Sequence, residues 1–105
     1  MQFTSYLQDG SLTVVLTGEI DHHCAKGYIQ AIASKLEVYT PKECILDFSQ
    51  VSFMDSSGIA VAINAMRSMT KLQGKLMVCG VKDQPQRVFR ASGMDKLIAM
   101  KEEPV

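Results

Sequence analysis

Small polar residues that could carry chemistry are concentrated in one segment, Phe-Met-Asp-Ser-Ser-Gly-Ile at residues 53–59. The segment follows an apolar run typical of a β-strand and precedes an apolar pattern of helical period. In α/β folds, ligands and partners favour the carboxyl ends of strands, and a helix start offers unpaired N–H groups with a partial positive charge. A phosphate on Ser56 or Ser57 would be tolerated there. The alternative is that Asp55 or Ser56 merely caps the helix, a common role for both residue types.

Three aspartates, Asp21, Asp47 and Asp55, are expected near strand ends, where they could hold Mg²⁺ or act as acid and base. Helix caps and solvated turns explain them without catalysis, so no catalytic residue is predicted. His22 and His23 are adjacent and would point in different directions on a helix, and no metal-type spacing of His or Cys accompanies them. No metal site and no cofactor are therefore predicted.

The three cysteines, at positions 24, 44 and 79, are widely spaced and form no Cys-x-x-Cys pair. This usage favours a reducing cytosol and disfavours a disulfide framework. Cys79 is expected to be a small buried apolar residue and not a nucleophile. Gly74 and Gly80 belong to no phosphate-binding loop, so no nucleotide site is predicted.

The length and charge of the chain exclude several classes of protein. Its 105 residues predict one domain over residues 1–105, and 11 basic residues balance 11 acidic ones. A neutral chain without a dense basic run is unsuited to nucleic acid. No apolar stretch approaches the roughly 20 residues of a membrane span, and no secretory signal is visible. A cytoplasmic protein without nucleic-acid or membrane partners is predicted.

The elements that position these residues begin with a predicted β-hairpin. Apolar residues alternate with polar ones over residues 11–17, a less regular strand precedes them, and Asp-Gly at residues 9–10 favours a tight turn. A helix follows, because apolar residues recur at spacings of three and four from position 25 to position 36. Asp21 can cap its start, and Pro41 marks its end.

Apolar patterns predict five further elements: strands over residues 44–48, 75–79 and 97–100, and helices over residues 59–69 and 83–92. Gly74 and Gly93 are natural ends for the two helices. The resulting order, β-β-α-β-α-β-α-β, predicts an α/β domain in which helices pack against a sheet with parallel crossovers. The opening hairpin makes that sheet mixed.

The second predicted helix carries a face of mostly small residues beside its apolar stripe: Ala60, Val61, Asn64, Ala65 and Ser68. Small side chains permit the close approach of another chain, but neighbouring loops of the same chain could equally cover this face. Four basic residues could help docking or simply be solvated: Arg67, Lys71, Lys75 and Arg87.

Three segments together resemble a known family: Gly-Glu-Ile-Asp-His-His at 18–23, Val-Ser-Phe-Met-Asp-Ser-Ser-Gly at 51–58, and Phe-Arg-Ala-Ser-Gly-Met at 89–94. Along nearly its whole length the chain is similar to the anti-sigma-factor antagonists, which are single-domain members of the STAS family, and most of all to the sporulation type. The resemblance implies an unphosphorylated form that binds an anti-sigma factor, itself a serine kinase, and so frees the sigma factor. It also implies a PP2C-type phosphatase that reverses the phosphorylation.

The resemblance implies that Ser56 is the phosphoacceptor, because this serine directly follows the Asp of the motif. Asp21 matches an acidic position that the family uses at the partner interface. Partner contacts are thus implied at Asp21, Asp55, Ser56, Ser57 and Gly58. The chain would be a substrate and not an enzyme, and ATP and Mg²⁺ would belong to the kinase. Family members usually continue into a C-terminal helix, which is expected to be short or absent here, with residues 101–105 frayed.

Two other functions stay open at this point. A STAS domain can be a structural subunit of a lipid-transport complex without phosphorylation, and a small enzyme could use the three aspartates. The hydroxyl in Asp-Ser-Ser-Gly favours the switch. A phosphate would take the net charge from zero to about −2 at a single helix start. Our hypothesis is that this local charge blocks partner binding without refolding the domain.

Overall fold

The computed structural model describes residues 2–102 and contains strands and helices in the predicted order. Its elements are β1 (Gln2–Gln8), β2 (Ser11–Ile20), α1 (His22–Tyr39), β3 (Glu43–Met54), α2 (Ser56–Lys71), β4 (Lys75–Cys79), α3 (Asp83–Ser92), the 3₁₀ helix η1 (Met94–Lys96) and β5 (Ala99–Lys101). The prediction of a mixed α/β domain is confirmed.

The five strands form one sheet in the order β1-β2-β3-β4-β5. β1 pairs antiparallel with β2, and every other neighbouring pair is parallel. Asp9 and Gly10 have φ of 53° and 81°, the left-handed pair that a two-residue hairpin turn requires, so the predicted hairpin is confirmed.

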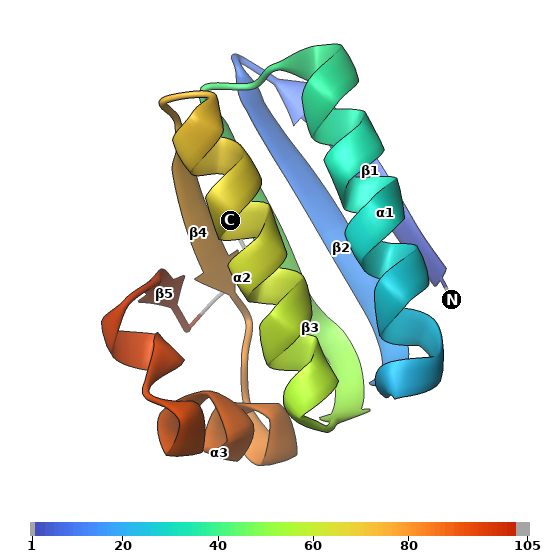
Figure 1. Ribbon diagram of the computed structural model, residues 1–105. Coiled ribbons are helices and arrows are strands. Elements are labelled where there is room, and N and C mark those ends of the chain that lie inside the picture. The colour runs from blue at the N-terminus through green and yellow to red at the C-terminus, as the bar shows by residue number, and fades with distance from the viewer. Residues whose placement is uncertain (1, 103–105) are drawn as a thin grey trace.

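Helices α1 and α2 lie side by side across one face of the sheet, and α3 lies at the end of the sheet where α2 begins (Figure 1). The core between these layers contains Tyr28, Phe48 and Phe89, all fully buried. Val61 and Ala65 of α2 are buried as well. Part of the small-residue face is therefore buried within the domain and not open to another chain, and neither of the two earlier interpretations describes it fully.

The end of the described chain differs from the prediction. The last strand begins at Ala99 and not at position 97, because η1 intervenes and leaves Leu97 71% exposed before the strand. No helix follows β5 within the described residues. Lys101 is paired in β5, whereas residues 103–105, which were expected to fray, lie outside the described residues. In the described part of the chain, no helix has the length and apolar character to cross a membrane.

Candidate functional site

Two strand-to-helix junctions lie next to each other at one edge of the sheet. Ile20 is the register partner of Met54, and the Asp55 N–H donates to the Ile20 carbonyl at 3.1 Å. Because β2 and β3 are parallel, their carboxyl ends meet at this edge, and the helices α1 and α2 both begin there (Figure 1). The fold thus brings together Asp21 and Asp55, which the sequence separates by more than thirty residues.

Asp21 is the N-cap of α1, as predicted. Its carboxylate accepts hydrogen bonds from the backbone N–H groups of His23 at 3.0 Å and Cys24 at 3.2 Å. In return, the Asp21 N–H donates to the Cys24 thiol at 3.4 Å. This reciprocal pair is a capping box in which a cysteine occupies the position usually held by Glu or Gln.

The capping box predicts how stability depends on the protonation of Asp21. Burial raises the pKa of this carboxyl, but the hydrogen bonds from the Cys24 backbone, the Cys24 thiol and the His23 backbone, with the charge of His23, together hold the pKa below its ordinary value of 3.8. The cap therefore stabilises the fold fully above pH 3.8 and is lost as pH falls through the lowered pKa. In an NMR titration, Cys24→Ala should raise the Asp21 pKa. An unchanged pKa in this variant would contradict the role given to the thiol.

Asp55 is the N-cap of α2, and its carboxylate accepts from the Ser57 N–H at 2.8 Å. Capping is therefore performed by Asp55 and not by Ser56. Ser56 is the first residue of the helix, is exposed, and makes no side-chain hydrogen bond within residues 2–102. Its hydroxyl is available at a helix start, where a partial positive charge favours anions.

Ser57 and Gly58 are less accessible than Ser56. Ser57 is half-buried, and Gly58 is buried against the end of β3. A Cβ atom at position 58 would lie 2.5 Å from the Met54 sulfur and 3.1 Å from its Cβ, so the glycine permits the close approach of α2 to β3. Direct partner contacts at these two positions, as at Asp21, Asp55 and Ser56, stay predictions.

Exposed residues that the sequence analysis did not assign also lie at this edge. Phe53 is 44% exposed and pairs in register with Glu19, which is also exposed. The two segments 18–23 and 51–58 contain three carboxylates and no Lys or Arg. An added negative charge here would therefore find no Lys or Arg side chain within these segments. In the sequence, an aromatic residue near the end of an apolar strand is the signal that could have identified Phe53.

The other candidates do not join this site. Asp47 lies inside β3, is 8% exposed and accepts from the Ser49 N–H at 2.8 Å, so its expected place at the strand end was wrong. Its side chain is enclosed because β3 runs on well beyond it. Among the described residues, no group of three or more His, Cys, Asp or Glu is placed to hold a metal ion. The three aspartates therefore do not form one cluster.

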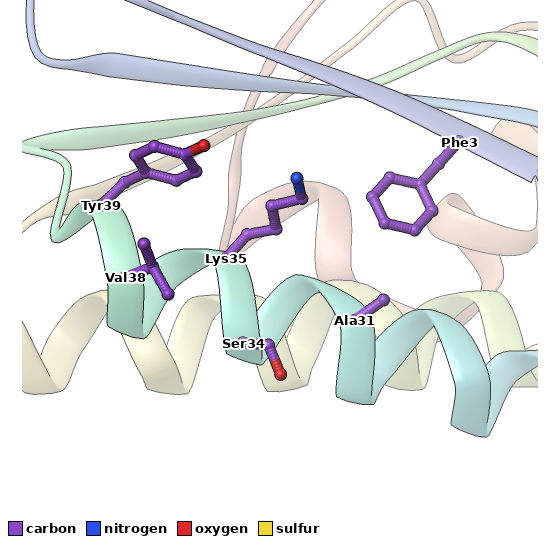
Figure 2. A pocket seen from close by; sticks show the side chains of 6 residues that line it. All are labelled: Phe3, Ala31, Ser34, Lys35, Val38 and Tyr39. Carbon is purple, nitrogen blue, oxygen red and sulfur yellow. The ribbon is translucent and has the colours of Figure 1, made fainter.

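Cys44, Cys79 and a surface pocket between β1 and α1 also lie apart from this site. Cys79 is buried, as predicted, and burial, with a smaller effect from the charge of Glu43, raises the pKa of Cys44 to about 12. Figure 2 shows a pocket of about 360 Å³ between β1 and α1, in which Lys35 lies between Phe3 and Tyr39. The Lys35 ammonium is 5.9 Å from the centre of the Tyr39 ring. This pocket contains no acidic residue and does not include Ser56.

Residues 2–104 match the family model of the STAS domain. The anti-sigma-B factor antagonist of Listeria monocytogenes is 34% identical over 93 residues, which cover 86% of this chain and 78% of that protein. The anti-sigma F factor antagonist of Paenibacillus polymyxa is 27% identical over 96 residues, covering 91% and 82%. The solved phosphorylated form of the Bacillus cell fate determinant SpoIIAA has a TM-score of 0.73 and 24% identity, with coverage of 97% and 93%, and shares the fold.

Proposed function

Since this chain belongs to the STAS domain family, and its relatives include antagonists of anti-sigma factors, we propose that it is an anti-sigma-factor antagonist. Its unphosphorylated form binds an anti-sigma factor and thereby releases a sigma factor. Phosphorylation of Ser56 switches this binding off. The chain is the substrate of this modification and not an enzyme, and it acts in the cytoplasm.

The observation that supports this proposal most directly is the position of Ser56. Its exposed hydroxyl lies at the first residue of α2, directly after the capping Asp55 and next to the start of α1. A kinase can reach this hydroxyl without unfolding any element of the domain. The anti-sigma factor is proposed to be that kinase, which supplies ATP and Mg²⁺, and a PP2C-type phosphatase removes the phosphate.

The charges at this edge give the switch a physical basis. A partner that covers Ser56 must exclude water from the start of α2. A phosphate of charge about −2 cannot be desolvated there without a cationic group, and the segments around it contain the carboxylates of Asp21, Asp55 and Glu19 and no Lys or Arg. Phosphorylation therefore opposes binding through local charge and bulk, with the backbone unchanged.

The proposal is tested by incubating the chain with its cognate anti-sigma kinase and ATP and then measuring the intact mass. We expect the mass of one phosphate to be added, and fragmentation should place it on Ser56. Ser57→Ala is the matched control that should still be phosphorylated, whereas Ser56→Ala should not. Tight binding to the anti-sigma factor with no mass gain would contradict the switch and favour a purely structural STAS subunit.

A further inference from the structure

The end of β3 lacks a neighbouring strand on one side. β3 pairs with β4 only from Glu43 to Asp47, but it continues to Met54. On its other side, β2 remains in register as far as Ile20 and Met54. Buried backbone N–H and C=O groups require hydrogen-bond partners, so the groups of Met54 that face away from β2 must be satisfied by something other than a strand.

The side-chain amide of Gln84 supplies both missing hydrogen bonds. Its Oε1 accepts from the Met54 N–H at 2.9 Å, and its Nε2 donates to the Met54 carbonyl at 2.8 Å. In an antiparallel pair, a single residue of the adjacent strand would make the same two bonds. A single side chain of α3 thus takes the place of β4 beside the last residue of β3.

Gln84 is held in a fixed position because α3 is anchored in the core. Pro85, the next residue, is buried. One turn further on, Phe89 is fully buried and packs edge-on against Phe48 of β3, with ring centres 5.4 Å apart and an angle of 85° between the rings. The backbone that carries the Gln84 side chain therefore cannot shift without disturbing this packing.

Met54 and Asp55 are also held from two other elements. The Asp55 N–H donates to the Ile20 carbonyl of β2 at 3.1 Å. Gly58 of α2 lies against the Met54 side chain, too close for a Cβ atom. Contacts from β2, α2 and α3 thus converge on the two residues immediately before Ser56.

We propose that Gln84 is a positioning residue for Ser56: through its two hydrogen bonds to Met54 it sets the backbone conformation in which the Ser56 hydroxyl is presented to a partner. The effect of Gln84 on the presentation of Ser56 to a partner rests on the proposed function, whereas its two hydrogen bonds to Met54 do not. Through Gln84, helix α3 takes part in the switch although it is distant from Ser56 in the sequence.

The chemistry of the bond pair provides a specific test. Gln84→Glu keeps the size of the side chain, but an ionised carboxylate accepts only and cannot donate to the Met54 carbonyl. A protonated carboxyl both donates and accepts and should restore the pair. The introduced carboxyl should thus titrate above the ordinary value of about 4.3 for glutamate. Gln86→Glu is the matched control, because Gln86 lies on the same helix and makes no hydrogen bond with Met54 in the described residues.

The experiment follows the backbone amide signals of residues 54–57 by NMR as a function of pH. Above the raised pKa, Gln84→Glu should shift these signals, because the Met54 carbonyl loses its donor while the Met54 N–H still donates to the carboxylate. Lowering the pH should return the signals to their wild-type positions. Gln86→Glu should show neither effect.

A parallel titration of the wild type distinguishes the introduced carboxyl from the other titrating groups. The acidic residues on or beside the elements packed around Gln84 are Glu43, Asp47, Asp55, Asp83 and Asp95, and the basic ones are Arg67, Lys71, Lys75, Lys82, Arg87, Arg90 and Lys96. All are present in both proteins, so a transition found only in Gln84→Glu belongs to the introduced carboxyl.

Two further measurements distinguish a failure of the positioning role from a failure of the proposed function. In the wild type, coupling across the hydrogen bond between the Met54 amide and the Gln84 side chain should be detectable, which needs no variant. Phosphorylation of Gln84→Glu by the anti-sigma kinase at neutral pH should show a kcat/KM about tenfold lower. Absent coupling, or wild-type amide signals in Gln84→Glu at neutral pH, would overturn the positioning role. A wild type that shows the coupling but is never phosphorylated would overturn the proposed function and leave the hydrogen-bond pair intact.

Discussion

Replacing Ser56 by Asp is expected to weaken binding of the anti-sigma factor by about 100-fold or more, whereas Ser56→Ala is expected to keep the affinity within about threefold. Burying an unpaired charge at an interface costs about 2–5 kcal/mol, and each 1.4 kcal/mol is tenfold in affinity. Removing an exposed hydroxyl changes little, because Ser56 makes no side-chain hydrogen bond within residues 2–102.

The large effect expected of Ser56→Asp depends on the surroundings of the residue. Asp21 and Asp55 already place two carboxylates at the starts of α1 and α2, and both are engaged as helix caps. A third carboxylate finds no Lys or Arg in the segments 18–23 and 51–58 to neutralise it. Desolvating it under a partner is therefore unfavourable, while in the free protein it remains hydrated.

Calorimetry with the purified anti-sigma factor measures this effect. Ser34→Asp is the matched control, since Ser34 is an exposed serine in the second half of α1, away from Ser56. This variant should bind within about threefold of the wild type. The amide spectrum of Ser56→Asp should change only near residues 53–58. Changes across the whole sheet would show that the switch acts by refolding, and undiminished binding would contradict the proposed interface.

Gly80→Ala is expected to destabilise the fold by roughly 2–5 kcal/mol. Gly80 has φ of 72°, a left-handed conformation that costs a residue with a Cβ atom about 1–2 kcal/mol. The added Cβ would also lie 2.9 Å from the Ser49 backbone nitrogen and 2.8 Å from its Cβ. Relieving this overlap requires a backbone shift, which costs about 1–3 kcal/mol more.

Gly93→Ala separates the two contributions. Gly93 ends α3 with φ of 78°, but a Cβ atom there would meet nothing within 4 Å. Only the conformational cost remains, so the free energy of unfolding of this variant should fall by about 1–2 kcal/mol. Urea denaturation of both variants measures the difference in the free energy of unfolding. Equal losses would show that β3 moves freely away from Gly80 and that the predicted overlap is harmless.

Much of the local structure could be predicted from residue patterns alone. The Asp-Gly turn, the capping role of Asp21 and the start of α2 after Asp55 each depend on residues within a few positions of one another. Alternating or helical periodicity likewise reports which face of a single element is apolar. Such features are set by backbone preferences and short-range hydrogen bonds, which can be inferred from residues that are close together in the sequence.

Where local patterns were not enough, the reason was packing between distant segments. Val61 and Ala65 of α2 are buried although they lie beside the predicted apolar stripe, and Asp47 is enclosed in a strand that runs on to Met54. The apolar run that begins at Leu97 was placed in a strand, although strand pairing starts only at Ala99, after a 3₁₀ turn. Each of these outcomes follows from contacts that no single segment contains.

By itself, the sequence determined the elements of this protein and the motif that places a serine at the start of a helix. The tertiary structure alone decided that Asp21 and Asp55 lie at one edge, and that Gln84 closes the end of β3 thirty residues away in the chain. The physical reason is that strand register and side-chain reach across elements depend on how the whole sheet and its helices pack. Periodicity and capping preferences act only along a single segment.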